Sequence, residues 1–196
     1  HPRRLTNTLG YDGGAWPSND SSMITWRANR PPPRSAWLTS YLELLQHGQV
    51  EPVDMQIYYM KLDGPMQLFP IQVTNLTGVS FAPFFLPDDS GMIFSSNTHD
   101  PEGGNFQLYM VNLDGTNVTR LTDPTTSSFT SFPMFSYPTG KDEDPMIVFC
   151  SDLGGLPQGQ IDVFVGRWVG PGSKTYREQQ AAAAAATANT ADARLL

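Results

Sequence analysis

The sequence has little of what marks several common classes of protein. A single cysteine, Cys150, excludes an internal disulfide. Charged residues are only 16% of the chain, and acidic residues exceed basic ones to give a net charge of −7. An acidic surface repels phosphate backbones, so we expect no nucleic-acid partner. No apolar run approaches the ~20 residues of a membrane-spanning helix, so we expect no membrane span.

Signs of catalysis are equally scarce. The three histidines, His1, His47 and His99, show no metal-ligand spacing, and neither a Gly-x-Ser-x-Gly nor a His-Glu-x-x-His motif is present. The acidic run at 142–144 lacks the spacing of a calcium-binding loop. We therefore expect no catalytic residue, no metal site, no cofactor and a protein that is not an enzyme.

The sequence does contain a short segment that recurs. Residues 56–64 read QIYYMKLDG, residues 107–115 read QLYMVNLDG, and a worn third copy at 160–165 reads QIDVFV. A short apolar segment precedes each copy, and a small or aromatic cluster beside proline precedes that segment. Repeats of about 20–50 residues indicate an array of like structural units.

Each unit has the composition of four short strands. Aromatic and β-branched residues fill the expected strands, while Gly, Pro, Asn and Asp fill the turns. Two units close on an apolar-Thr pair, Val73-Thr74 and Leu121-Thr122. Four antiparallel strands in about 50 residues describe a β-propeller blade, so the predicted fold is an all-β propeller with three blades. The rival interpretation is a β-sandwich whose hairpins are similar by chance.

These elements together resemble a known family, the WD40-like repeat of TolB-type propellers. The second unit is the most similar, from Phe81 to Asn97 and from Leu108 to Gly115. The third departs at 137–144, where an acidic insertion replaces a compact turn, and again at Asp162. The resemblance covers about residues 5–168. It implies a fold more than a function, because such propellers serve as periplasmic binding proteins, peptidase-associated domains and partner platforms.

The resemblance also implies that blades are missing. Family propellers usually have about six blades, and this chain matches a C-terminal portion of three. The boundaries that we expect are 13–74, 80–122 and 130–168 for the blades, within a propeller region of 1–169, and 170–196 for an Ala-rich tail.

The third unit has no closing apolar-Thr strand, whereas an orphan one, Arg4-Leu5-Thr6, stands near the first residue. An open blade edge is a template for strand addition, and exposed blade faces need cover. Three interpretations follow. The chain is a fragment of a longer protein, two half-rings pair, or the 4–6 strand of one copy completes the third blade of a neighbour.

Two segments interrupt the repeat. Segment 31–55 opens with three prolines, and its apolar spacing from Trp37 to Leu45 predicts a short amphipathic helix that ends at Gly48. We expect this helix to cap one mouth of the ring, where it either covers apolar surface or shapes a partner site, with Trp37 as an apolar anchor. In the tail, Ser173 can cap a helix that reaches the alanine run, although such runs are often flexible linkers.

Polar corners follow the second strand of each unit and are the predicted binding positions. Loops at one end of a repeat scaffold usually carry its binding residues. Three Asn-x-Ser/Thr sequons fall in expected turns and are glycosylation candidates if the chain is secreted. The binding candidates are Asn29, Arg30, Asn97, Thr98, His99 and Asp152, and the glycosylation candidates are Asn19, Asn75 and Asn117.

The predicted function is a non-catalytic scaffold for protein interaction or assembly, in an extracellular or periplasmic location. Its partners would be other copies of the chain or the missing blades of a longer one. One alternative is the propeller domain of a hydrolase whose catalytic domain lies outside this chain. Another is a propeller that binds carbohydrate or a small ligand by stacking on Trp16, Trp26 or Trp168.

Overall fold

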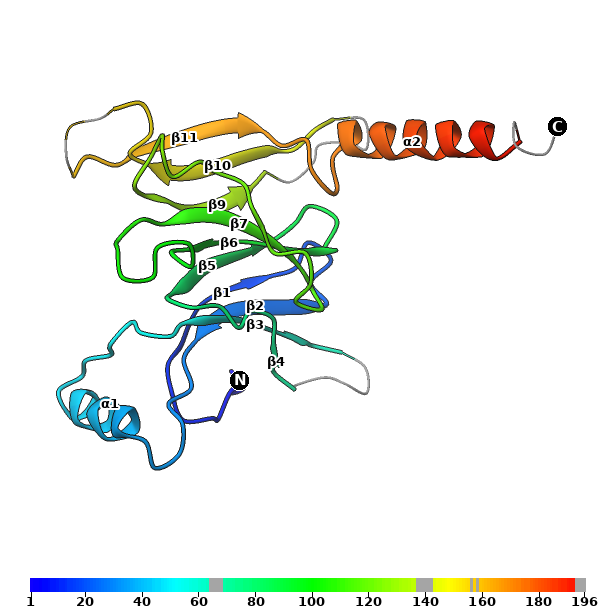
Figure 1. Cartoon of the computed structure of the whole chain (residues 1–196). Coiled ribbons are helices and arrows are strands. Elements are labelled where there is room, and N and C mark those ends of the chain that lie inside the picture. Colours follow the sequence, from blue (N-terminus) through cyan, green and yellow to red (C-terminus); the bar gives the residue numbers. More distant parts are fainter. Residues whose placement is uncertain (64–68, 137–142, 156, 158, 193–196) are drawn as a thin grey trace.

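The computed structural model describes residues 1–63, 69–136, 143–155, 157 and 159–192. Three small antiparallel sheets lie one upon another, and the strands of each sheet follow in chain order (Figure 1). Blade one contains β1 (Asp12–Pro17), β2 (Met23–Ala28), β3 (Gln56–Lys61) and β4 (Ile71–Gln72). Blade two contains β5 (Ser80–Phe85), β6 (Gly91–Ser96), β7 (Gln107–Asn112) and β8 (Thr119–Arg120). Blade three contains β9 (Thr130–Phe135), β10 (Met146–Ser151) and β11 (Asp162–Arg167). The predicted propeller-type blades are confirmed.

The strand register corrects the third copy of the repeat. Gln56 lies opposite Ala28 in blade one, and Gln107 lies opposite Ser96 in blade two. The residue at the same place in blade three is Asp162, opposite Ser151. The copy predicted to begin at Gln160 was therefore misplaced by two residues. Gln160 belongs to the preceding turn, where its N–H donates to the carbonyl of Pro157 at 2.9 Å.

An aromatic pair joins the second and third strands of every blade. The two rings face each other across the ladder, with interplanar angles of 14–27°. Such cross-strand pairs add stability beyond the area that they bury. The pairs are Trp26 with Tyr58 (ring centroids 6.0 Å apart), Phe94 with Tyr109 (5.9 Å) and Phe149 with Phe164 (5.7 Å).

Apolar side chains between the blades form the core. Between blades one and two, Ile57 and Tyr59 meet Phe85, Met92 and Val111. A second cluster lies between blades two and three and contains Leu86, Ile93, Leu108, Ile147 and Trp168. Blade two thus buries both of its faces, and blades one and three each bury the face that meets blade two, as packed sheets do.

The apolar-Thr pairs have a specific use at the outer edge of a blade. β4 and β8 end two residues before Thr74 and Thr122, so the closing strands lie slightly earlier than predicted. The hydroxyl of Thr74 accepts from the N–H of Ile57 at 2.8 Å and donates to the side-chain carbonyl of Gln56 at 2.8 Å. In blade two, Thr122 bonds to Leu108 and Gln107 in the same way, at 2.9 and 2.5 Å. The threonine hydroxyl thus extends the ladder beyond the end of the backbone strand.

Two helices leave the blades. Helix α1 (Ala36–Gln46) begins at the N-cap Ser35, whose hydroxyl accepts from the N–H of Leu38, and Gly48 follows its end with φ of 67°. The predicted helix is confirmed. Figure 1 shows α1 beside blade one, and Tyr41 on this helix is only 3% exposed, so α1 is packed on the protein through that side chain. Its role as a cap stays a prediction.

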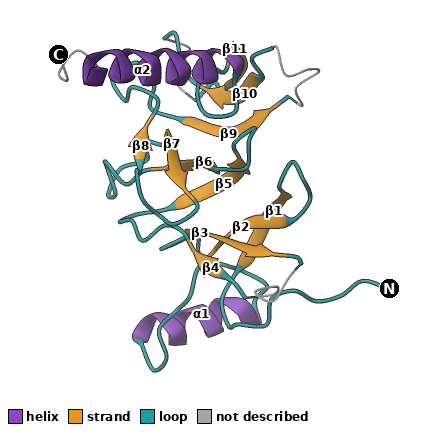
Figure 2. Cartoon of the chain, turned by 90° about the vertical axis from the view of Figure 1, so that its right-hand side faces the viewer, coloured by secondary structure: helices purple, strands orange, loops and turns teal. Residues whose placement is uncertain are grey.

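Helix α2 (Lys174–Asp192) forms most of the tail and extends away from the sheets beside blade three, at the opposite end of the molecule from α1 (Figure 2). The Ser173 hydroxyl accepts from the N–H of Tyr176 at 3.0 Å, as predicted for a cap. Asp144 accepts from the N–H and hydroxyl of Thr175 at 2.8 and 2.6 Å. Neither described helix combines the length and apolar character needed to cross a bilayer.

The threonine bond predicts a loss of stability on removal of one hydroxyl. Thr74→Val keeps the side-chain volume but leaves the buried N–H of Ile57 without its acceptor. We expect the free energy of unfolding to fall by about 1–3 kcal/mol, measured by urea denaturation. Thr39→Val, on the exposed side of α1, is the matched control and should change it by less than about 0.5 kcal/mol. Equal effects of the two variants would contradict the assigned role.

Candidate binding surfaces

The predicted polar corners are brought together at one end of the blades. The loops that follow β2, β6 and β10 lie at the end of the sheets toward α1, away from α2 (Figure 1). The arrangement is the one expected of a repeat scaffold.

Three of the corner residues share one structural task. The side-chain oxygen of Asn29 accepts from the N–H of Tyr11 at 2.9 Å, just before β1 begins. In blade two, Asn97 accepts from Val79 at 2.7 Å. Asp152 accepts from the N–H groups of Ser128 and Phe129, both at 3.0 Å, and from the Ser128 hydroxyl. Each residue ties the end of a second strand to the start of the first strand.

These three residues differ in how deeply their side chains are buried. Asn29 and Asn97 are only 1% and 5% exposed, and their amide nitrogens donate to loop carbonyls at 3.2–3.3 Å. Their polar atoms are therefore occupied within the chain, and they position the loops. Asp152 is partly exposed. Burial raises its pKa, but the hydrogen bonds from Ser128 and Phe129 outweigh that effect and hold the pKa below the usual range.

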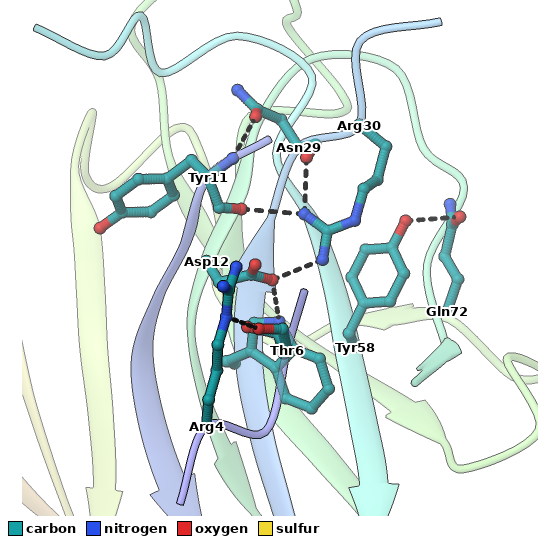
Figure 3. A network of polar contacts seen from close by, with 9 residues as sticks. Arg4, Thr6, Tyr11, Asp12, Asn29, Arg30, Tyr58 and Gln72 are labelled. Carbon is teal, nitrogen blue, oxygen red and sulfur yellow. Dashed lines mark hydrogen bonds and ion pairs between the residues drawn. The ribbon is translucent and has the colours of Figure 1, made fainter. Parts of the chain in front are cut away.

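Arg30 lies in a network on blade one (Figure 3). Its guanidinium pairs with Asp12 at 2.5 Å, donates to the carbonyl of Tyr11 at 3.1 Å, and lies 5.2 Å from the ring centre of Tyr58. Trp26 donates to the same Asp12 oxygen at 2.7 Å. Burial raises the pKa of the Tyr58 hydroxyl, and the charge of Arg30 partly opposes this. Arg30 thus connects the loop after β2 with the start of β1 in the same blade.

The remaining corner candidates are partly exposed. A ring nitrogen of His99, Nδ1, shares a hydrogen bond with the Tyr109 hydroxyl at 3.0 Å, and burial raises the pKa of that hydroxyl. The Thr98 hydroxyl lies 3.4 Å from that of Thr77. Trp37 is half-buried on α1, and its indole N–H has no acceptor among the described residues. The binding roles of His99, Thr98 and Trp37 stay predictions.

The proposed assembly strand lies at the outer face of blade one. Residues 4–6 form no strand here, and the Arg4 Nε donates to the carbonyl of Thr6 at 2.6 Å. Leu5 packs against a cluster that includes Trp26 and Tyr58. Val73 packs in the same way against the aromatic pair of blade two, Phe94 and Tyr109. Leu5 therefore holds on blade one the place that a closing strand holds on the next blade.

The three sequons differ in what their side chains do. The Asn19 amide nitrogen donates to the Leu86 carbonyl at 2.9 Å and to Asp89 at 2.8 Å, so it bridges blades one and two. A glycan would be attached at that same atom. Asn75 and Asn117 are exposed in turns.

The three tryptophans proposed to contact a ligand differ in their exposure. Trp26 and Trp168 are buried in the core, while Trp16 is exposed beside Phe84, with ring centroids 5.4 Å apart. Of the three, only Trp16 is placed to meet a ligand.

A cleft between the blades was missed by the sequence analysis. Its volume is about 460 Å³, and it lies at the start of the first strands. We call it the aromatic cleft. The residues were missed because they come from three repeats and the insertion, and no motif joins them. They are Tyr11, Arg27, Val50, Pro52, Met55, Val79, Phe81, Phe106 and Phe132.

The outward face of blade three is the second exposed apolar surface. Val163 and Val165 are 72% and 66% exposed. By register they correspond to Ile57 and Tyr59, which are 0% and 8% exposed in blade one. Within the described residues, blade three also has no fourth strand beside β11.

Comparison with solved structures identifies the fold to which this arrangement of blades belongs. A structure from Agrobacterium tumefaciens that is assigned to TolB aligns with 85% of this chain at a TM-score of 0.53 and 21% identity. The chain has a TolB-like β-propeller fold. It spans 51% of the length of that protein. Hydrazine synthase from Kuenenia stuttgartiensis aligns with 74% of the chain and 21% of its own length, at a TM-score of 0.46 and 18% identity. No protein-family model and no curated protein matches the sequence.

The Asp152 bonds in this TolB-like fold predict a pH dependence. Its folded pKa lies below the unfolded value of about 4, so its carboxylate stabilises the fold above that pH. This contribution is lost as the pH falls through the folded pKa. Asp152→Asn copies the residue that blades one and two use. We expect the difference in melting temperature between wild type and variant to be constant above about pH 5 and to change below about pH 4.

The control for this experiment is Glu102→Gln, which removes an exposed carboxylate from a loop of blade two. Its melting curve should follow that of wild type at every pH. A difference between wild type and Asp152→Asn that stays constant down to pH ~2.5 would show that the carboxylate adds no acid-dependent stability.

Proposed function

We propose that the protein is a non-catalytic propeller scaffold that binds protein partners through the face and edge of blade three. The observation that carries the proposal is the exposure of Val163 and Val165, at positions that the next blade covers elsewhere. The TolB-like fold supports a scaffold role. An extracellular or periplasmic location belongs to the proposal, with Asn75 and Asn117 as the accessible glycosylation candidates.

The face of blade three provides the apolar contact. In blade one the equivalent residues Ile57 and Tyr59 bury themselves against Phe85 and Met92 of blade two. Removing such surface from water is worth about 25 cal/mol per Å². An exposed pair of valines on a flat sheet face therefore favours a partner that presents a similar sheet face.

The edge of β11 provides the specificity. Val163 corresponds to Ile57 and Leu108, whose N–H groups each donate to a threonine hydroxyl of the closing strand. Asp162 corresponds to the glutamines whose side-chain oxygens accept from that hydroxyl. A carboxylate accepts this bond as well as an amide does. The edge is therefore matched to a strand that ends in an apolar residue and threonine.

The segment Arg4-Leu5-Thr6 has that sequence. Thr6 lies six residues before β1, and Thr74 lies six residues before β5. A second copy can donate this segment to β11, which would give a head-to-tail assembly. Pairing of two half-rings and completion by further blades of a longer chain are the other ways to cover the same surface.

Changing the face of blade three tests the proposal. We expect the wild-type particle to have a mass of at least two chains of 21.6 kDa, measured by light scattering after size exclusion. Val163→Lys combined with Val165→Lys places two charges on the face and should give a single-chain mass with an intact circular dichroism spectrum. Val118→Lys, in an exposed turn of blade two, should behave as wild type. A single-chain mass for wild type across the concentration range would overturn the self-association.

A second variant separates strand donation from face pairing. Thr6→Val removes the hydroxyl that would bond to Asp162 and to the N–H of Val163. If the 4–6 strand is donated, the dissociation constant of the assembly should rise about tenfold, in line with one lost buried hydrogen bond. Thr8→Val is the control, since Thr8 is exposed outside the segment. Identical constants for the two variants would favour paired half-rings instead.

A further inference from the structure

The aromatic cleft lies at the inner side of all three blades and is separate from the β11 surface. Its walls are rings in edge-to-face contact, with Phe81 5.0 Å from Phe106 and 5.7 Å from Phe132 between ring centres. A further ring can pack on these walls in the same edge-to-face geometry. The volume of about 460 Å³ falls in the range of small-molecule pockets.

One guanidinium lies in this apolar lining. Arg27, on β2, donates to the Tyr11 hydroxyl at 3.1 Å and lies 5.6 Å from the centre of the same ring. Among the described residues, no carboxylate lies within 4.0 Å of it, whereas Arg30 on the same blade is paired with Asp12. Arg27 is the one charged residue among the described residues that line the cleft. Its planar fork is suited to a carboxylate, which it can hold through two parallel hydrogen bonds.

The backbone at Phe132 gives a second, independent observation. The first strand of each blade has a bulge, and the residue in it has a positive φ: 64° at Gly14, 49° at Ala82 and 56° at Phe132. A bulky side chain is disfavoured in this conformation, and glycine is not. Phe132 is nonetheless present and 49% exposed, with its ring at the cleft. Strained residues that persist in this way are concentrated at functional sites.

The insertion supplies the remaining wall. Val50, Pro52 and Met55 follow α1 and line the cleft together with the rings of blades two and three. The segment that interrupts the repeat therefore closes a space that three plain blades would leave open.

We propose that the aromatic cleft binds a small arylalkyl carboxylate, with its ring packed against Phe81 and Phe132 and its carboxylate on Arg27. The aromatic lining selects the ring, and Arg27, the one charged residue in the described lining, selects the anion. The proposal does not depend on the role of blade three, because no residue of the cleft lies on β11.

Titration calorimetry with the full chain tests this binding. The probe is 3-phenylpropionate, and 2-phenylethylamine is the matched compound with the opposite charge. We expect saturable binding of the carboxylate with a dissociation constant between about 10 μM and about 1 mM, and no measurable binding of the amine. Absence of saturable carboxylate binding, or equal binding of the two compounds, would overturn the proposal.

Two variants test the two assigned roles. Arg27→Gln should weaken binding of the carboxylate by about tenfold to about a hundredfold, whereas Arg3→Gln, which makes the same charge change on an exposed residue outside the cleft, should not. Phe132→Gly removes a wall but suits the positive φ, so the melting temperature should stay level or rise while affinity falls. Unchanged affinity in either Arg27→Gln or Phe132→Gly would overturn the proposed site.

Discussion

The face-to-face packing of one blade on the next is the interaction on which the rest of the molecule depends. A four-stranded sheet of this size cannot hold its apolar faces in water, so each blade is stable only as part of a stack. The buried residues Ile57, Met92 and Ile93 all lie at such contacts. At the two ends of the stack the requirement remains but the neighbour differs. Leu5 partly covers blade one, and Val163 and Val165 stay exposed on blade three.

The fold could be predicted from the sequence because it is a repeat. A single strand of six residues carries a weak signal, but the same order of strand, corner and turn in three places adds up. Helix α1 was predictable for a different reason, since its apolar spacing and Gly48 are local signals. The register of β11 was not predictable in the same way. Matching letters favoured Gln160, and a shift by two residues leaves each side chain on the same face, so the apolar alternation cannot choose between the two registers. The register observed with β10 brings Phe164 opposite Phe149, a pairing between distant segments that the letters of β11 alone do not show.

The candidate sites show where sequence reasoning ends. Asn29, Asn97 and Asp152 were correctly grouped as equivalent positions, yet their equivalence is first of all structural: all three accept from backbone N–H groups at the start of a first strand. A polar residue that recurs at the same position in every blade has the same role in each blade, and in a scaffold that role is often to fix the position of the loop. In the aromatic cleft, by contrast, the important residues are not repeated between the blades. Phe132 and Arg27 stand where the other blades have different residues, so no comparison between repeats could select them.

Helix α2 gives the molecule a long arm with a fixed base. Thr175 is bonded to Asp144, and Asp144 also pairs with Arg167 at the end of β11, with the carboxylate 3.8 Å from the guanidinium. At 1.5 Å per residue the helix is about 28 Å long. A rotation of its base by about 10° would move its far end by about 5 Å for a helix of that length. A small change in the tilt of β11 would therefore produce a large displacement of the far end of α2.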